Sequence, residues 1–366
     1  YLTTTKKGDL SHLIEAKKEN LKDHLLIDNN TKRNLELTET VRLRERTNSL
    51  LCLLDKNKPA MGSRLLKQNI ESPLTNKKEI ERRYDFVDKL RVEFILRDEL
   101  KNYLNDVYDL ERLAGRICYG NLNARDLLQL KNSIKVLPEI KKILTELKYD
   151  KDVETYDELF SLLDKSINED APLTLKEGSL IKSGYNEELD EVRLLASGSK
   201  DFILELEQKE KERTGIKNLK VGFNKVFGYY IEISKGQVKE LKEEYGYERK
   251  QTLSNCERFV TPLLKEKENI ILGAEEKIIN LEYQLFMKIR EIVKRYISSL
   301  QKTATIIAEV DMLCSFSTVA DLYNFVRPKL VNDMTVKIIE SRHPVIEQVM
   351  SKENKNITRI LHITEC

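Results

Sequence analysis

The side chains best suited to contact phosphate lie in the segment 214–262. Nine of its residues are basic and six are acidic, a net charge of +3, against +2 for all 366 residues. Lys225 lies in one predicted turn of this segment, and Lys250, Ser254 and Asn255 lie near another. Ammonium groups offer charge to a phosphate oxygen, and hydroxyl and amide groups offer hydrogen bonds. The composition predicts a phosphate-binding surface, and an ordinary solvated sheet is the alternative.

The other reactive residues form no pattern that indicates catalysis or metal binding. The five cysteines contain no CxxC pair, and their odd number favours free thiols in a reducing cytoplasm. The four histidines form no cluster with the spacing of metal ligands, and no catalytic triad or carboxylate dyad stands out. No uninterrupted apolar run approaches the ~20 residues of a membrane span, and the first residues lack the apolar region of a signal peptide. We therefore predict a cytoplasmic protein without catalytic, cofactor-binding or metal-binding residues in this chain.

Two long helices are predicted to flank the segment 214–262. Residues 185–213 contain no proline, and their apolar residues keep a roughly heptad spacing. Beyond Pro262 an apolar residue recurs every seven positions, which predicts a helix over 265–300. That repeat consists of Ile271, Ile278, Leu285 and Ile292. A chain that leaves along one helix and returns along another forms an antiparallel stalk.

Between these helices the sequence is typical of a small β-sheet. Tyr229, Ile231 and Ile233 alternate with residues of a different kind, which is the period of two expected of a half-buried strand. Residues 220–223 and 251–253 are the predicted partner strands. Residues 224–228 are the predicted turn, because Asn and Gly tolerate a positive φ.

The first ~190 residues are predicted to be a succession of helices. One of them begins at Pro59 and ends before Pro73, and others are expected over 77–108, 125–147 and 150–167. The predicted fold class is mainly α, with a multi-helix core, two long antiparallel helices, and a small β-rich part at their tip.

Several stretches resemble, in the same order, the signatures of one protein family. Residues 32–40 (KRNLELTET) and 60–67 (AMGSRLLK) are similar to two stretches of a helical core domain. Residues 184–190 are similar to the entry into a lever helix, and 212–216, 219–224 and 227–231 to a clamp. The family is MutS, the DNA mismatch repair proteins. The domains that the resemblance implies are the end of a connector at 1–8, a helical core at 9–184, an ascending lever at 185–213, the clamp at 214–262, a descending lever with its return to the core at 263–330, and the start of a truncated ATPase domain at 331–366.

In that family the clamp holds duplex DNA by its backbone without reading sequence, and the levers couple the clamp to the ATPase domain. The resemblance implies the same role here, with Asn224 and Asn255 as phosphate contacts carried over from the clamp sequence. Ser254 stands where the family commonly has Lys. Lys225 and Lys250 are added on charge alone. The predicted DNA-binding residues are thus Asn224, Lys225, Lys250, Ser254 and Asn255.

The resemblance also implies functions that this chain is not expected to perform alone. Residues 1–5 resemble the end of the connector, so the mismatch-reading domain is expected to be absent. Residues 341–347 resemble the first strand and turn of the ATPase domain, but no glycine follows Gly273, so the phosphate loop G-x-x-x-x-G-K-[ST] is missing. We therefore expect no ATPase activity from this chain. ATP and magnesium, a second copy of the chain and a MutL-type partner are implied for the intact protein.

The alternative is a helical scaffold whose β-rich tip binds another protein. Four aromatic residues, Phe223, Phe227, Tyr229 and Tyr230, would then form an exposed apolar patch rather than a small core. Charge reversal at Lys225 and Lys250 distinguishes the two hypotheses. It weakens binding to DNA of any sequence if the tip holds phosphate, and it changes little in a scaffold.

Overall fold

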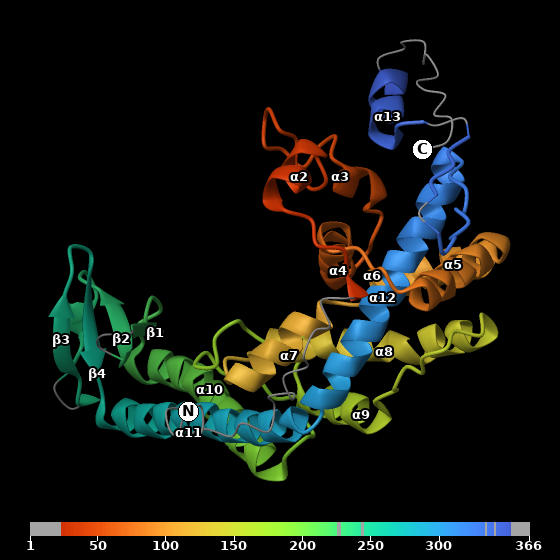
Figure 1. Ribbon diagram of the computed structural model, residues 1–366. Coiled ribbons are helices and arrows are strands. Elements are labelled where there is room, and N and C mark those ends of the chain that lie inside the picture. The colour runs from red at the N-terminus through yellow and green to blue at the C-terminus, as the bar shows by residue number, and fades with distance from the viewer. Residues whose placement is uncertain (1–22, 225–227, 243–244, 334, 340–341, 353–366) are drawn as a thin grey trace, which may run out of the picture. The chain divides into compact units, whose positions relative to one another are not determined.

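The computed structural model describes residues 23–224, 228–242, 245–333, 335–339 and 342–352, without the side chains of 199–204 and 350–352 (Figure 1). The chain divides into two compact units. One comprises Tyr1–Leu122, Asp126–Leu163 and Ile292–Cys366, and the other comprises Asn123–Arg125 and Asp164–Glu291. The predicted connector residues 1–8 lie outside the described residues, as does Lys225.

The helices before the sheet, labelled as in Figure 1, are α2 (Asn29–Asn34), α3 (Leu50–Leu54), α4 (Ala60–Glu71), α5 (Lys77–Val92), α6 (Phe94–Asn105), α7 (Leu110–Tyr119), α8 (Ala124–Glu146), α9 (Asp157–Ser166) and α10 (Glu187–Thr214). After the sheet follow α11 (Pro262–Lys294), α12 (Ile297–Tyr323) and α13 (Pro344–Lys352). The expected succession of helices is therefore present, with shifted boundaries.

Helix α12 is the centre of the first unit, where α4, α5, α6 and α7 pack against it. By length and composition it could cross a membrane, yet 72% of its most apolar window is buried inside the structure. Apolar side chains of α12 such as Ile307, Val310 and Leu313 are fully buried. The hydropathy of α12 is thus explained by its place in the core.

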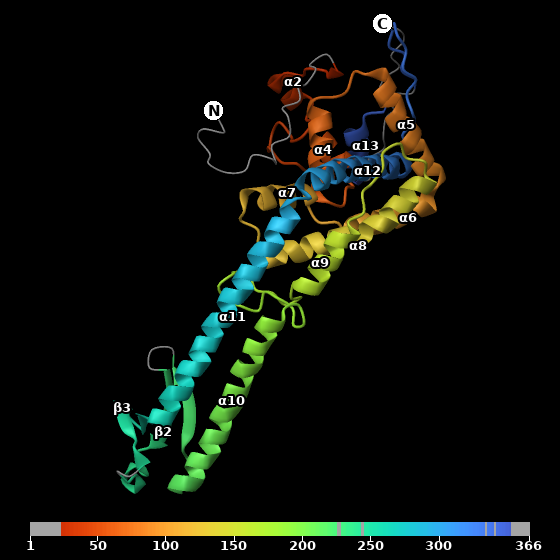
Figure 2. The same cartoon turned by 90° about the horizontal axis from the view of Figure 1, so that it is seen from below.

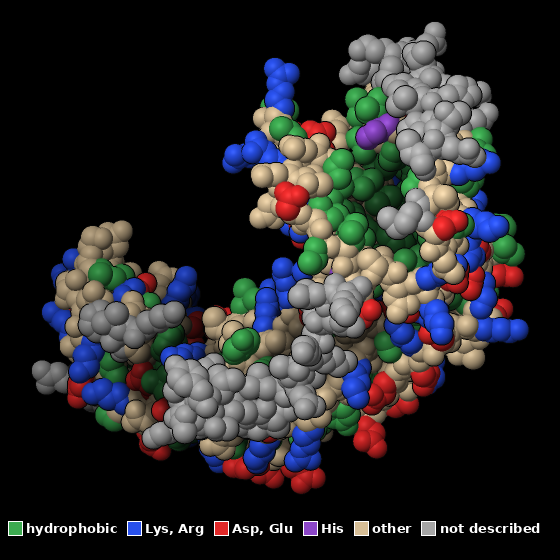
Figure 3. All heavy atoms as spheres, in the orientation of Figure 1, with side chains coloured by type: hydrophobic (Ala, Val, Ile, Leu, Met, Phe, Trp, Pro, Cys, Tyr) green, Lys and Arg blue, Asp and Glu red, His purple; other side chains and the backbone are tan. Residues whose placement is uncertain are grey.

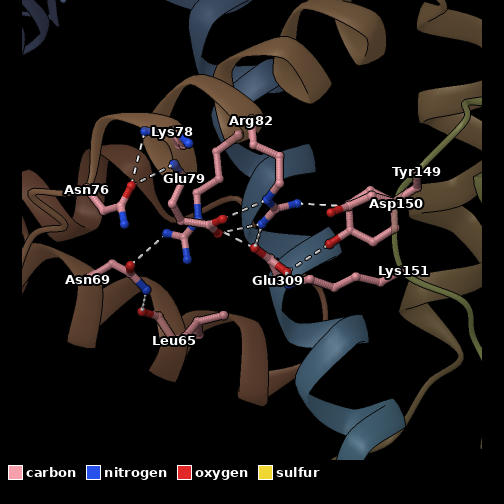
Figure 4. Close-up of polar contacts among 11 residues, drawn as sticks. Leu65, Asn69, Asn76, Lys78, Glu79, Arg82, Tyr149, Asp150, Lys151 and Glu309 are labelled. Carbon is pink, nitrogen blue, oxygen red and sulfur yellow. Dashed lines mark hydrogen bonds and ion pairs between the residues drawn. The ribbon is translucent and has the colours of Figure 1, made fainter. Parts of the chain in front are cut away.

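Two acidic residues, Glu309 and Asp311, are buried on this central helix. Glu309 accepts a hydrogen bond from the Tyr149 hydroxyl at 2.8 Å and pairs with Arg82 and Lys151 (Figure 4). The two oxygens of Asp311 accept the Lys58 backbone N–H at 3.0 and 3.2 Å. Both carboxyl groups therefore tie α12 to segments far away in the sequence.

The second unit contains the two long helices and the sheet between them. Helices α10 and α11 run antiparallel (Figure 2). The Asn186 side chain caps the start of α10 by accepting the Leu189 N–H, and Gly215 ends it in the left-handed conformation at φ +72°. Glu282 of α11 accepts bonds from Arg193 of α10 at 2.5 Å and from the Leu180 N–H at 2.8 Å.

The sheet has four antiparallel strands in the order β1-β2-β4-β3. They are β1 (Lys220–Asn224), β2 (Gly228–Ser234), β3 (Glu248–Thr252) and β4 (Cys256–Val260), with a short 3₁₀ helix at Val238–Glu240. The sequence predicted that 251–253 would pair with the strand around Ile231. Instead β4 lies between β2 and β3, because the chain reverses where the Leu253 N–H bonds to the Cys256 carbonyl at 2.9 Å.

The predicted fold class is confirmed, while several predicted helices differ in extent. The helix expected over 77–108 is broken at Glu93 into α5 and α6, and that expected over 265–300 ends at Lys294 before α12 begins. Within 150–167 only α9 is helical. Where the resemblance predicted a strand and turn, Pro344 starts α13, and the His343 ring accepts the Ile346 N–H at 3.2 Å.

Candidate nucleic acid interface

One face of the sheet is packed on the two long helices. Ile231 and Ile233 of β2 and Phe259 of β4 point to this inner face because strand residues alternate between faces. They form an apolar cluster with residues of α10, α11 and the intervening loop. The full cluster is Leu206, Ile216, Leu219, Ile231, Ile233, Phe259, Leu264 and Ile271. Burial of this face fixes the sheet on its helices and leaves the other face, the outer face, toward solvent.

Polar contacts hold the start of β3 against the end of α10. The Tyr247 hydroxyl donates to Glu210 at 2.5 Å, and burial together with this carboxylate raises the pKa of Tyr247. Arg213 donates to the Tyr245 carbonyl at 3.2 Å, with its guanidinium carbon 5.1 Å from the centre of the Tyr245 ring. These contacts give the sheet a second attachment, besides its apolar face.

The start of β2 lies beside helix α11. Glu268 of α11 accepts the Tyr229 N–H at 3.0 Å. A Cβ atom at Gly228 would lie 1.6 Å from the same carboxylate, and Gly228 has φ +76°, so only glycine fits here. Asn224 is paired with Gly228 and therefore lies at this end of the sheet.

The opposite end of the sheet is formed by two turns, 234–237 and 253–256, which we call the distal turns. The Lys235 N–H donates to the Asn255 carbonyl at 3.2 Å, and Ser234 is paired with Cys256. Lys235, Ser254 and Asn255 are all exposed. A primary amine, a hydroxyl and an amide are thus close together on the surface, which is a donor set that suits a phosphate oxygen. Figure 3 shows Lys and Arg side chains on the surface of the sheet.

The predicted residues do not form one site. Ser254 and Asn255 are together at the distal turns, whereas Asn224 lies at the other end of β2, about 20 Å away at the usual rise per strand residue. Lys250 is the extra residue of a β-bulge between Arg249 and Gln251, and it is exposed with its ammonium nitrogen 3.8 Å from Glu248. Residue type predicted which side chains contact phosphate, but the strand register decides which of them lie close enough to share one phosphate group.

Two basic residues near the distal turns were not singled out from sequence. Lys235 follows β2 directly, which any strand-plus-turn prediction could have indicated. Arg258 lies on the outer face, where it donates to Glu232 and Gln251, each at 3.0 Å. Its guanidinium carbon is 4.1 Å from the centre of the Tyr230 ring, and the Glu232 carboxylate raises the pKa of Arg258. This arrangement depends on β4, which the sequence did not reveal.

The aromatic residues of the sheet are largely occupied within it. Tyr229 packs against the inner-face cluster, and Tyr230 lies against Arg258. Phe223 is 49% exposed, with its ring centre 4.9 Å from that of Tyr229. Phe227 lies outside the described residues. Among the three described residues, only Phe223 could contribute much to an apolar docking patch.

Replacing Gly222 with valine is expected to destabilise the sheet. A Cβ atom at this position would lie 2.8 Å from the Tyr230 ring, so the ring must move and lose its contact with Arg258. We expect the free energy of unfolding to fall by about 1–3 kcal/mol. Thermal unfolding followed by circular dichroism measures this, and an unchanged melting temperature would contradict it.

Comparison with known proteins identifies the family to which this chain belongs. A family model described as MutS domain III matches residues 30–317, which include the helical first unit up to α12, both long helices and the whole sheet. This chain belongs to the MutS family. Its relatives include the proteins named DNA mismatch repair protein MutS from Staphylococcus aureus strains MRSA252, bovine RF122 / ET3-1 and JH9. Each is 49% identical over 356 residues, which is 96% of this chain and 41% of the relative. The chain thus spans less than half the length of these MutS proteins.

The residues described here do not fit a nucleotide or its metal ion. Within the described ranges no group of three or more His, Cys, Asp or Glu side chains could hold a metal ion. The sequence has no glycine after Gly273, so it lacks the glycine-rich loop whose backbone N–H groups cradle a triphosphate.

Proposed function

We propose that this chain holds duplex DNA by its backbone, as part of a cytoplasmic DNA mismatch repair protein. The observation that carries the proposal is the gathering of exposed Lys235, Ser254 and Asn255 at the distal turns of a sheet whose inner face is fixed on two long helices. Hydroxyl, amide and amine groups on surface turns can bind the phosphates of DNA of any base sequence. Reading the base sequence would require side chains that enter a groove and contact base edges.

Lys250, Asn224 and Ser254 have different roles in this proposal. Lys250, exposed on the bulge of the edge strand β3, adds charge near the distal turns. Asn224 belongs to the opposite end of the sheet, so it would contact a different part of the backbone. Ser254 offers a hydroxyl hydrogen bond where a lysine would offer charge, and so it contributes less to salt-dependent affinity.

The long helices are proposed to couple the sheet to an ATPase domain in the intact protein. Buried Glu282 joins α11 to Arg193 of α10 at 2.5 Å and to the Leu180 N–H at 2.8 Å. Such a tie makes the two helices move together, which is a requirement for transmitting a displacement along them. We further propose, on the family alone, that the intact protein uses ATP and magnesium, pairs with a second copy of itself, and acts with a MutL-type partner.

The alternative function is a scaffold whose sheet binds another protein. Exposed Phe223 is the observation in its favour. Tyr229 and Tyr230 argue against it, because their rings are engaged in the inner-face cluster and with Arg258.

The proposal is tested with a double charge reversal, Lys235→Glu with Lys250→Glu. Fluorescence anisotropy with labelled ~30-bp duplexes, matched and mismatched, measures affinity across a salt series. We expect weaker binding to both duplexes alike, and a salt dependence whose slope falls by about one for each phosphate contact removed.

The matched control is Lys135→Glu with Lys302→Glu, which changes net charge equally at two exposed lysines of the first unit. It should leave binding close to the wild type. Equal loss in both double variants would mean that net charge alone governs binding. No loss in the Lys235/Lys250 variant would refute the proposed interface and favour the scaffold.

A further inference from the structure

A closed surface loop at residues 40–45 connects the segment after α2 to α3. The Thr40 N–H bonds to the Glu45 carbonyl at 2.9 Å, and the Arg44 N–H bonds to the Thr40 carbonyl at 3.1 Å. The Val41 N–H donates to the Glu36 carboxylate at 2.7 Å. These bonds join both ends of the loop and fix its backbone without burying its side chains.

The loop presents apolar and basic side chains together to solvent. Leu43 is 67% exposed and Val41 is 37% exposed, and nearby Leu35 is 61% exposed. Arg42 and Arg44 are exposed as well, and neither side chain makes an ion pair or hydrogen bond with another described residue. Figure 3 shows Lys or Arg side chains protruding over this part of the first unit. Clustered exposed apolar residues with arginines are typical of protein interfaces.

Arg44 has a backbone conformation that its side chain does not explain within the fold. Its φ is +53°, in the left-handed region where glycine is favoured. Two neighbours share this region for evident reasons. Glu36, at φ +48°, uses its carboxylate to hold the Val41 N–H, and Asn48, at φ +65°, is a residue type that tolerates the region. A strained arginine whose side chain has no partner among the described residues indicates a contact outside the fold.

We propose that residues 40–45, together with Leu35, form a docking surface for a protein partner. That partner would present apolar side chains bordered by carboxylates, which complement Leu43 and the two arginines. A nucleic acid fits less well, because three exposed aliphatic side chains have no counterpart on a phosphate backbone. Arg46 adds no charge to the surface, since it is paired with Asp55.

The test selects partners by chemistry. A phage-displayed library of random peptides is panned on the folded wild-type chain and counter-selected on the variant Arg42→Glu with Arg44→Glu. The backbone bonds of the loop do not involve these two side chains. We expect the selected peptides to combine Asp or Glu with large apolar residues. They should bind the charge-reversed variant and Leu43→Ser at least about tenfold more weakly, while the Lys135/Lys302 variant binds as the wild type does.

Three results would overturn the proposal. The first is the selection of peptides that lack acidic residues, or that bind the wild-type chain and the Arg42/Arg44 variant equally well. Another is a failure to select any peptide that distinguishes the two forms. The third is a loss of duplex DNA binding in the Arg42/Arg44 variant as large as in the Lys235/Lys250 variant, which would make the loop a nucleic acid surface. Arg44→Gly is a separate check. It should raise the melting temperature by relieving the left-handed φ, yet weaken peptide binding.

Discussion

Replacing Glu309 with alanine is expected to lower the free energy of unfolding by about 3–5 kcal/mol. The Glu309 side chain is 5% exposed and is the centre of a cluster that joins α12 to α5 and to the segment after α8 (Figure 4). Its removal leaves the charges of Arg82 and Lys151 close together and takes the acceptor from the Tyr149 hydroxyl. Arg82 keeps Glu79 at 2.6 Å and Asp150 at 3.0 Å, so the loss is expected near the lower end.

Chemical denaturation of the wild type and Glu309→Ala measures this loss. The matched control is Glu248→Ala, because Glu248 also pairs with lysines but its side chain is 60% exposed. Exposed pairs contribute little, so this control should lose less than about 1 kcal/mol. Equal losses in the two variants would show that burial of the Glu309 cluster is not what stabilises the core.

The same cluster predicts loss of stability in acid. Burial acts to raise the pKa of Glu309, but hydrogen bonds and charge from Lys151, Tyr149 and Arg82 outweigh it and hold the pKa below its usual value of 4.5. The unfolded chain therefore binds the proton first, and the stabilisation is lost as pH falls below about 4.5. Glu309→Gln should show a shallower decline over that range, and an identical decline would contradict this assignment.

Replacing Gly62 with alanine is expected to destabilise the core by about 3 kcal/mol, although alanine is favoured over glycine in a helix. A Cβ atom at Gly62 of α4 would lie 2.0 Å from a carboxylate oxygen of Asp311 on α12. That carboxyl group is buried and holds the Lys58 N–H, so it cannot move away freely. The clash therefore outweighs the gain in helix propensity.

Gly115→Ala on α7 is the matched control. A Cβ atom there meets nothing within 4 Å, so the substitution should stabilise the protein by up to about 1 kcal/mol. Thermal and urea unfolding of both variants measure the two changes. The expected result is a change of opposite sign at the two positions. Stabilisation by both alanines would mean that α4 and α12 separate without cost.

Asp311 also predicts a pH dependence above the acidic range. Burial raises its pKa from 3.8 to about 8. Between these values the unfolded chain releases the proton while the folded chain keeps it, so the folded state loses stability as pH rises from about 4 to about 8. Asp311→Asn carries no such titration. Its stability relative to the wild type should therefore grow over this interval, by up to about 1.4 kcal/mol per pH unit. A constant difference would refute the assignment.

The long helices show how far a heptad repeat predicts packing. The repeat Ile271, Ile278, Leu285 and Ile292, with Ile289 in its second position, predicted the packed side of α11. Ile271 and Ile289 are buried, whereas Ile278, Leu285 and Ile292 are only half-buried. Phe286 and Val293, which are outside the predicted repeat, are fully buried. Glu282 is buried among them through its bonds to Arg193 and Leu180. A repeat shows that a helix has an apolar side, but the neighbouring elements decide which residues are covered.

In the candidate site too, the local sequence pattern predicted an element but not how it is arranged with its neighbours. Alternation in β2 predicted a half-buried sheet at the tip of two helices, and the structure confirms it. The five residues of β4 were missed because they carry charged and apolar side chains in a short run that follows a turn. Without β4 the sequence offered no reason to place Asn224 and Asn255 at opposite ends of the sheet.

The sequence by itself therefore determined the fold class and the family, because these depend on local periodicity, turn chemistry and residue type. Tertiary structure alone decided three things. It brought Lys235 to Ser254 and Asn255, and it enclosed Glu309 and Asp311 within the core. It also left the Arg42 and Arg44 side chains without an ion pair or hydrogen bond to any other described residue. Each depends on contacts between residues far apart in the chain, and local pattern carries no information about which distant partner a side chain meets.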